Sequence, residues 1–536
     1  MLVRSNEATE HLASVFSCFS RFLSGDFFYL DLKIRVIQFS YLQNKITNMK
    51  NRSFLFLLVL PLFSLSQTNP PALSAIKIED LKTDLYAMAG DHFRGREAGT
   101  LDELKVSVWW AEELRKVGLS PAGDDGTYFQ FFSLLRNRIS SNSTVSIGDH
   151  SLQLWKDVLV AQTARVTVSA PIFFLGKPTS ADINKADIKG KAVVINASTD
   201  GLNLNVSLAE RRYPGYVLRK YQTDLQAKEV AAIIFVADEM GEKSWSQVVP
   251  QMTRGQYDVD QGANLITGTR APVLWVHASA IDWLKENGAM LKANIITERF
   301  EYPSVNIVGV IDGTDKELSK EYVLFSGHQD HDGVRQPYGD DSIYNGADDN
   351  ASVSVALLAI ARAFKKNPGK RSALFVWHGA EERGLLGSRW YSSHPTVPKN
   401  SIVAVLNGDM IGRNNIDSAA LLGVQPPHLN SSDLVAMAME ANNEGPKFKL
   451  DTMWDKTTHV EGWYFRSDHL FYARAGIPAI YYSSLLHSEY HTPMDEPKNI
   501  NYEKLKKMTE WIYRTGWKVA NAAKRPALVP NFKLER

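Results

Sequence analysis

The stretch EYVLFSGHQDHDGVRQPYGDDSIYNGADDN, residues 321–350, contains the strongest structural signal in the chain. It opens with an apolar run over residues 322–325 that has the length and composition of a buried strand, and the run gives way to a cluster of His, Asp and Gly. His328 and Asp330 are two positions apart, so an extended backbone points them to the same side, where the carboxylate can orient a metal-binding imidazole. The closing GADDN offers a carboxylate at the start of a helical pattern over residues 351–364.

The composition is that of an ordinary globular protein. With 536 residues, 44% hydrophobic and 22% charged, the chain is too long for one simple domain, and we expect two or more units. The formal net charge of +1 and the lack of a basic stripe give no argument for a nucleic-acid partner. Cys18 is the only cysteine, so a disulfide within the chain and a thiolate metal site are both excluded, and any metal must use His and carboxylate ligands.

Residues 49–67, MKNRSFLFLLVLPLFSLSQ, have the pattern of a secretory signal. Lys50 and Arg52 precede an apolar run over residues 54–63, and small residues follow it. We therefore predict a signal peptide over residues 49–66 and export to the periplasm or the extracellular space. The apolar run is about half of the ~20 residues that a membrane-spanning helix needs, so we expect no stable membrane insertion, with a permanent anchor as the alternative.

Residues 1–48 match no targeting signal. Because a signal peptide acts at an N-terminus, we interpret Met49 as the true start and residues 1–48 as a non-native N-terminal extension. The alternative is a genuine cytoplasmic extension that precedes a signal anchor.

The predicted secondary structure of the remaining chain changes its pattern twice. Residues 75–119 are predicted to be helical, and residues 128–158 to form short strands separated by Asn and Gly turns. Residues 160–297 contain short apolar strands such as KAVVINAS and APVLWVHAS, separated by polar segments in which we expect no long helices. This pattern predicts an inserted β-rich domain that acts as a lid or a partner surface. An alternation of helices and strands then resumes and continues to the end of the chain.

Three further apolar runs predict buried strands, and candidate ligands follow each of them. The runs and the residues beyond them are 372–377 with Glu381 and Glu382, 402–406 with Asp409, and 479–482 with His491. In a doubly wound, largely parallel sheet flanked by helices, the carboxyl ends of the strands share one edge, and ligands bind there. We therefore predict an α/β fold of this type, in which these residues converge with His328.

The predicted cluster has the ligand chemistry of a zinc site. Two His and several carboxylates suit one or two Zn²⁺ ions, and two ions ~3.5–4 Å apart can share a bridging carboxylate and a water that becomes hydroxide at neutral pH. A carboxylate that binds no metal can take the proton of that water and pass it to a leaving amine, which typically contributes ~10²–10⁴-fold to the rate. The doubled Glu381–Glu382 supplies one residue for each task.

Six ordered motifs resemble those of the M28 family of zinc metallopeptidases, whose members are mostly aminopeptidases. They are GHQDHDG, GADDNAS, HGAEERGLLGS, LNGDMIGR, FRSDHLFYARAGIPA and YHTPMDE. The resemblance spans residues 75–525 and implies a zinc exopeptidase fold, with an N-terminal part of the peptidase domain over residues 75–158 and a catalytic metallopeptidase domain over residues 298–525. Residues 160–297, with ADIKGKAVVINAS and VAAIIFVADE, resemble the protease-associated domain inserted in many of these enzymes.

The resemblance implies a ligand set for two Zn²⁺ ions per chain. The implied ligands are His328 and Asp409 for the first ion, Glu382 and His491 for the second, and Asp349 as the bridge between them. The bridge is the fourth residue of the G-A-x-D pattern, which selects Asp349 rather than Asp348. A cis peptide bond is implied between Asp349 and Asn350.

Further roles follow from the same resemblance. They are general base for Glu381, orientation of His328 for Asp330, substrate contact for Arg466, oxyanion stabilisation for Tyr490, and reception of the substrate's ammonium for Asp409 together with Glu381. Val353 stands where the family usually has Gly, and we expect it to crowd the start of the helix and narrow the pocket.

Other polar residues near the motifs match no ligand. We expect solvated or hydrogen-bonded roles for His331, His469 and His487, a loop surface for Asp332, Asp340 and Asp341, and either a structural or a ligand-orienting role for Asp468.

The sequence therefore predicts a secreted dizinc exopeptidase that acts on peptides, most simply an aminopeptidase. A carboxypeptidase or dipeptidase of the same fold is the first alternative, because Arg383, Arg389, Arg413 and Arg466 offer cations for a terminal carboxylate. A single-zinc glutaminyl cyclase is the second, although it has little reason to keep five ligands and a free Glu381. An inactive binding protein is the third, although such relatives usually lose ligands.

Overall fold

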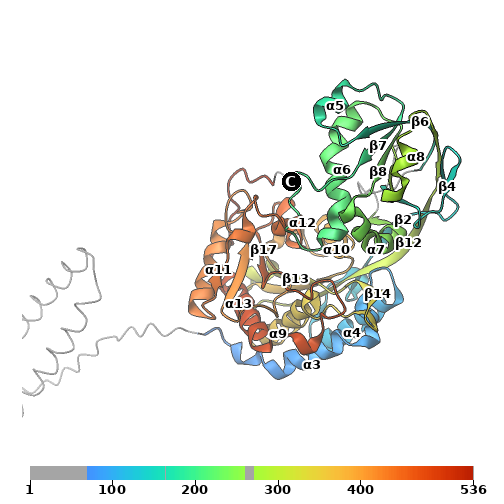
Figure 1. Cartoon of the computed structure of the whole chain (residues 1–536). Coiled ribbons are helices and arrows are strands. Elements are labelled where there is room, and N and C mark those ends of the chain that lie inside the picture. The colour runs from blue at the N-terminus through green and yellow to red at the C-terminus, as the bar shows by residue number, and fades with distance from the viewer. Residues whose placement is uncertain (1–68, 163–164, 260–270, 535–536) are drawn as a thin grey trace, which may run out of the picture. The chain divides into compact units, whose positions relative to one another are not determined.

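The computed structural model of the chain describes residues 69–162, 165–259 and 271–534 (Figure 1). The predicted signal peptide over residues 49–66 and the extension over residues 1–48 lie outside the described residues. Among the helices of the described residues, none combines the length and the apolar character needed to cross a membrane.

Within the described residues, the larger sheet has ten strands and a parallel centre. Its strand order is β19-β18-β20-β17-β13-β16-β12-β2-β9, with β1 paired to β12. The bounds are β1 Ser120–Pro121, β2 Phe129–Ile139, β9 Gln256–Val259, β12 Thr297–Ile311, β13 Tyr322–His328, β16 Ser372–His378, β17 Ile402–Gly408, β18 Ser418–Leu422, β19 Lys449–Leu450 and β20 Ala479–Ser483. The central strands β20, β17, β13 and β16 pair in parallel. Antiparallel pairs attach β18 on one side and β12, β2, β9 and β1 on the other.

The predicted largely parallel sheet is therefore correct for the centre and wrong for the flanks. Parallel neighbours need a crossover connection, usually a helix, whereas antiparallel neighbours do not. The chain between β2 and β12 builds a separate unit instead of a crossover helix on this sheet, and β12 returns antiparallel to β2. An apolar pattern carries no information on strand direction, so the sequence could not reveal this.

Helices cover both faces of the larger sheet. Their bounds are α3 Ile78–Met88, α4 Leu101–Val117, α9 Val353–Lys366, α10 Leu386–Ser393, α11 Ser432–Glu444, α12 His469–Arg474 and α13 Tyr502–Asn521. The core that contains α9 and α13 takes up Val323 and Phe325 of β13, whereas Leu324 packs into the opposite core with Tyr472 of α12. Because β13 is buried on both faces, it appears in the sequence as a continuous apolar run.

A second, eight-stranded sheet lies within the described residues between β2 and β12. We call residues 144–295 without β9 the inserted unit; its strand order is β4-β3-β11-β6-β7-β8-β10-β5. The bounds are β3 Thr144–Ile147, β4 His150–Leu152, β5 Val158–Gln162, β6 Val166–Gly176, β7 Ala192–Asn196, β8 Ala232–Val236, β10 Val273–Val276 and β11 Met290–Ile295, with helices α5 Ser180–Lys185, α6 Ala209–Ala227, α7 Glu239–Arg254 and α8 Ile281–Leu284.

The inserted unit differs from the expected β-rich domain in two ways. Its sheet begins at Thr144, before the expected boundary at residue 160, and residues 256–259 leave it to join the larger sheet as β9. It also contains the long helices α6 and α7, although the sequence pattern predicts no long helix here. Each carries a proline within the helix, Pro214 in α6 and Pro250 in α7, and a proline in the sequence argues against a helix at that point.

Candidate metal centre

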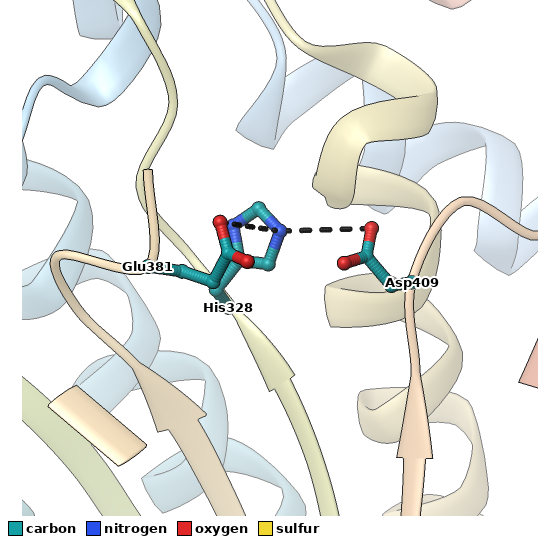
Figure 2. Close-up of side chains that lie close together, drawn as sticks. All are labelled: His328, Glu381 and Asp409. Atoms are coloured by element: carbon teal, nitrogen blue, oxygen red, sulfur yellow. Dashed lines mark ion pairs between the residues drawn. The ribbon is translucent and has the colours of Figure 1, made fainter. Parts of the chain in front are cut away.

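His328 ends β13 at the carboxyl edge of the parallel centre, and its side chain is fully buried. The ring Nδ1 lies 3.0 Å from the backbone carbonyl of Asp330, so it donates there in the tautomer that leaves the Nε2 lone pair free. Nε2 lies 3.8 Å from Glu381 Oε2 and 3.7 Å from Asp409 Oδ1. Figure 2 shows these two carboxylates on either side of the ring, each on the segment that follows a strand.

Asp349 lies between the two predicted histidine ligands. Its Oδ1 is 3.2 Å from His328 Nε2, and its Oδ2 is 3.1 Å from His491 Nε2, so each oxygen of one carboxylate faces a different imidazole. Asp349 belongs to the π-helical turn η6 (Ala347–Ser352) that precedes α9, and its peptide bond to Asn350 is cis, as the resemblance implied. Its backbone N–H donates to Asp495 at 3.0 Å, which fixes the turn.

The neighbouring Asp348 points elsewhere. Its Oδ1 accepts the backbone N–H of Gly412 at 2.6 Å, and its Oδ2 lies 3.5 Å from His487 Nε2. Burial raises the pKa of Asp348 to about 7. The structure therefore brings Asp349, and not Asp348, against His328 and His491.

Glu382 and His491 meet beside Asp349. Glu382 Oε1 lies 3.3 Å from His491 Nε2, and Asp332 Oδ2 lies 3.4 Å from the Nδ1 of the same ring. His331 Nδ1 lies 2.9 Å from Glu382 Oε1. Among the described residues, sets whose ligand atoms lie within 4.8 Å of one another are His328 with Glu381 and Asp409, His331 with Asp349 and Glu382, and Asp332 with Glu382 and His491.

Asp332 is wrongly expected on a loop surface. Its side chain is buried, and it contacts Arg335, Arg383 and His491. His331, for which either a solvated or a hydrogen-bonded role was expected, is fully buried, so the solvated alternative is wrong. The sequence held one usable signal, because Asp332 stands two positions beyond Asp330 and the same-side argument made for His328 and Asp330 can be extended to it.

The other residues near the motifs lie outside the cluster. Asp340 is exposed next to the strand pair β14 (Gly333–Tyr338) and β15 (Asp341–Tyr344). His487 contacts Asp348 and Glu489. His469 is buried against Tyr481, and burial lowers its pKa to about 3. Asp468 is buried as well, and burial raises its pKa to about 7.

Asp330 orients the glutamate pair more directly than it orients His328. Its carboxylate accepts the backbone N–H of Glu381 at 3.0 Å and that of Glu382 at 3.3 Å. The same carboxylate lies 3.8 Å from His328 Nδ1, beyond hydrogen-bond distance, so the carbonyl of Asp330 holds the ring instead. Asp330 thus joins the loop after β13 to the loop after β16, and burial raises its pKa to about 6.

The pKa values of the two adjacent glutamates are shifted in opposite directions. Burial raises the pKa of Glu381 well above its usual value, and Glu382 and Asp409 raise it further, although His328 opposes them. Burial also favours the protonated form of Glu382, but His491 and His331 outweigh it and lower the pKa of Glu382 well below its usual value. Neighbouring groups whose environments separate their pKa values are suited to different tasks.

Tyr490 and Arg466 form a pair beside His491. Arg466 Nη2 donates to the Tyr490 hydroxyl oxygen at 2.7 Å, and the Tyr490 ring centroid lies 3.9 Å from that of His491. The other cations that the sequence offered also have carboxylate partners. Arg383 contacts Asp332 and Glu97, Arg389 contacts Asp258, and Arg413 contacts Glu489.

A cleft of about 760 Å³ reaches the cluster from the side of the inserted unit. Residues of α6 and α7, residues 459–462, Tyr490 and His491 line it. Val353 does not line this cleft. It is fully buried beneath the cluster, where a Cβ on Gly327 would lie 2.6 Å from its Cγ1, so the expectation that Val353 narrows the pocket is wrong.

The donor set fits a metal such as zinc. Within the described residues, His328 Nε2, both ring nitrogens of His331, and Glu382 Oε1 are buried and make no hydrogen bond; the short contact between His331 Nδ1 and Glu382 Oε1 lacks hydrogen-bond geometry. Orphaned buried polar atoms are costly, and a cation among them removes that cost. The cluster presents imidazole nitrogens and carboxylate oxygens, which are ligands that Zn²⁺ accepts.

Comparison with known proteins agrees with the M28 resemblance. Residues 306–515 match the model of peptidase family M28. Over 191 residues the chain is 26% identical to the aminopeptidase YwaD of Bacillus subtilis, a match that covers 34% of this chain and 40% of the relative. The chain therefore spans less than two thirds of the length of this curated relative.

Solved structures show the fold. The aminopeptidase from Aneurinibacillus sp. strain AM-1 superposes with a TM-score of 0.54 at 17% identity, over 87% of this chain and 98% of that one. BSAP, a zinc aminopeptidase from Bacillus subtilis, superposes with a TM-score of 0.52 at 19% identity, over 85% of this chain and 99% of that one. At these identities the likeness establishes a shared mixed α/β fold.

Proposed function

We propose that this protein is an exported dizinc exopeptidase of the M28 type that removes amino-terminal residues from peptides. One observation carries the proposal: the Asp349 carboxylate directs one oxygen toward His328 and the other toward His491. This arrangement is what a carboxylate needs to serve two metal ions at once. The family match over residues 306–515 and the relatives named aminopeptidases support the same reading.

The proposed ligands divide around that carboxylate. His328 and Asp409 would hold one zinc, Glu382 and His491 would hold the other, and Asp349 would serve both. When bound, the ions lower the pKa of a water and polarise the scissile carbonyl. His331 and Asp332 contact Glu382 and His491, and we assign them the task of orienting those two ligands.

Glu381 is the proposed general base. It is not needed as a ligand, and its backbone is fixed by the hydrogen bond to Asp330. Burial favours the protonated form of its carboxyl group, so Glu381 can hold a proton taken from water until the leaving amine accepts it. Tyr490 is the proposed oxyanion donor, because its oxygen already accepts from Arg466 and its own O–H is free to donate.

Attack from the amino end is favoured over attack from the carboxyl end. A terminal carboxylate needs unpaired cations, yet Arg383, Arg389, Arg413 and Arg466 all contact carboxylates. A terminal ammonium needs carboxylates, which Glu381 and Asp409 supply beside His328.

The test compares a free-amine leucyl arylamide with its N-acetylated form on the purified zinc-loaded protein. We expect cleavage of the free amine only, and complete and reversible loss of activity on chelation. Efficient cleavage of the acetylated substrate, or release of residues from the carboxyl end of a peptide, would make the protein a carboxypeptidase-type or other hydrolase. Absence of any hydrolysis would end the proposal.

Export and the identity of the inserted unit complete the proposal. The pattern over residues 49–66 supports a signal peptide, so the mature protein should begin near Gln67. Recovery of peptides from residues 1–48 in exported protein would contradict this. The motifs ADIKGKAVVINAS and VAAIIFVADE, which include β7 and β8, support a protease-associated domain for the inserted unit.

A further inference from the structure

Glu461 bonds the inserted unit to the part of the chain that carries the larger sheet, which we call the peptidase side of the cleft. Its side chain is 5% exposed, and it accepts hydrogen bonds from both sides. From the inserted unit, the Ser207 hydroxyl donates at 3.0 Å and Arg212 Nη1 at 2.8 Å. The backbone N–H of Ser207 donates to the same carboxylate. From the peptidase side, Arg466 Nη1 donates at 2.8 Å.

Arg466 continues this chain of contacts to the candidate metal centre. One guanidinium nitrogen is held by Glu461, and the other, Nη2, donates to the Tyr490 hydroxyl at 2.7 Å. The guanidinium also lies over the ring of Trp463, 4.6 Å from its centroid. Tyr490 in turn packs on His491. Direct contacts therefore run from the inserted unit to the metal centre.

The Glu461 carboxylate lies between two guanidinium groups and compensates their charges. Arg212 and Arg466 both donate to Glu461 Oε2, so without the negative charge two guanidinium groups would face each other in a largely buried place. Ser207 and Arg212 flank the first turn of α6, which lets one helix end supply both donors. An anion at a helix N-terminus is also favoured by the helix dipole.

We infer that Ser207, Arg212 and Glu461, which we call the Glu461 clamp, are positioning residues that hold Arg466 against Tyr490, so that the inserted unit is required for turnover and not for metal binding. The inference rests on the proposed function, because Tyr490 has a catalytic role only there. None of the clamp residues belongs to the candidate metal cluster.

The clamp acts by fixing the direction of the Tyr490 O–H bond. While Arg466 donates to the Tyr490 oxygen, the phenol O–H must point away from Arg466 and can donate to an oxyanion. When Arg466 is no longer held, Tyr490 loses this fixed orientation. The transition state then loses a hydrogen bond that the ground state does not use, so kcat falls and KM changes little.

The first experiment removes the charged one of the two side chains through which the inserted unit bonds Glu461. We expect Arg212→Ala to lower kcat for the leucyl arylamide by about 10- to 100-fold, as expected for residues that orient catalytic groups, with KM, zinc content and melting temperature close to wild type. Arg212→Lys should restore part of the loss because it returns the charge. Lys220→Ala is the matched control. It removes the same charge from α6 at a lysine that donates to the Asp200 carbonyl, and it should leave all four quantities unchanged.

The second experiment tests whether the clamp acts through Tyr490. In a Tyr490→Phe background, Arg212→Ala should cause little further loss, because residues that act as one unit are not additive. A full additional loss would show that Arg212 supports the fold in general and would overturn the inference. If Arg212→Ala does not fold, Ser207→Ala removes only a hydroxyl and should lower kcat less but in the same way.

The outcomes separate the inference from the function on which it rests. Wild-type protein without peptidase activity would end both. Active wild type together with full kcat in Arg212→Ala and Ser207→Ala would overturn the clamp alone. Loss of zinc in either variant would also overturn it, because the clamp would then support metal binding.

Discussion

The two sheets of the described residues share an architecture but differ at their carboxyl edges. Both have a parallel centre, formed by β20, β17, β13 and β16 in the larger sheet and by β6, β7, β8 and β10 in the inserted unit. In the inserted unit, His277 follows β10, and its ring bonds Glu242 at 2.7 Å and the Lys156 carbonyl at 2.8 Å. The side chains of His277 and Glu242 are 33% and 37% exposed.

In the larger sheet, the His and Glu side chains that follow the strands are buried instead of partly exposed. His328, His331 and Glu382 are buried, and each retains at least one polar atom that has no hydrogen-bond partner within the described residues. Position at a carboxyl edge is thus shared by both sheets. Among the described residues, buried atoms without a hydrogen-bond partner also occur in the inserted unit, on Asn196 and Trp275, whereas at the candidate metal centre they occur on several His and Glu side chains that lie together. The comparison indicates that the site is marked where unsatisfied buried atoms gather on several His and carboxylate side chains, and not by a position at the carboxyl edge alone.

The largest expected effect concerns the carboxylate between the two histidines. Asp349→Ala should remove both zinc ions and reduce hydrolysis by more than the ~10²–10⁴-fold expected for loss of a general base. Zinc analysis of the purified variant and the leucyl arylamide assay measure this. Asp340→Ala, at an exposed loop position, is the control and should change neither. A variant that keeps one fully occupied zinc would show that Asp349 is not shared.

The next effect separates the two adjacent glutamates. Glu381→Gln should keep a normal zinc content and lose ~10²–10⁴-fold in kcat, because it removes a proton acceptor and leaves the ligands intact. Glu382→Gln should lose zinc. If the zinc contents of these variants were exchanged, the roles within the pair would be reversed.

A smaller effect tests the packing beneath the metal centre. A Cβ on Gly327 would lie 2.6 Å from Val353 Cγ1, so Gly327→Ala should lower the free energy of unfolding by ~1–3 kcal/mol through overpacking. Urea unfolding of the metal-free protein measures it, and adding Val353→Ala should restore part of the loss.

The inserted unit offers the matched glycine. Gly215 lies within α6, where an added Cβ would meet only the flexible end of Arg219 at 3.4 Å. Gly215→Ala should therefore raise the free energy of unfolding by ~0.5–1 kcal/mol, because Ala loses less backbone entropy than Gly in a helix. Equal destabilisation by both substitutions would mean that the space beneath His328 is not unusually tight.

The smallest effect lies at the exposed edge of the inserted unit. Glu242→Gln should change the free energy of unfolding by no more than ~1 kcal/mol, because exposed ion pairs contribute little, and it should leave zinc content and kcat unchanged. A drop in bound zinc would place a metal ligand at this edge and would break the contrast between the two sheets.

The sequence alone determined the parallel centre of the larger sheet and the residue types at its edge. Apolar runs that alternate with helical segments predict a parallel sheet, and these runs end abruptly, so β13, β16, β17 and β20 and the candidate ligands that follow them could be predicted. The choice of Asp349 over Asp348 as the bridge came from motif resemblance and stays a prediction; in the structure the Asp348 carboxylate accepts a hydrogen bond from the Gly412 N–H.

Only the tertiary structure shows where a loop side chain points and which segments, distant in the sequence, lie in contact. Asp330 directs its carboxylate to Glu381 and Glu382, which lie 51 and 52 positions away, and Ser207 meets Glu461 across 254 positions. Hydrophobic periodicity reports only which face of a local element is buried, so it carries no information on these contacts. Packing against residues far along the chain also determines three features that the sequence did not predict. They are the burial of Asp332, the antiparallel flanks of the sheet, and the helices α6 and α7, which contain Pro214 and Pro250.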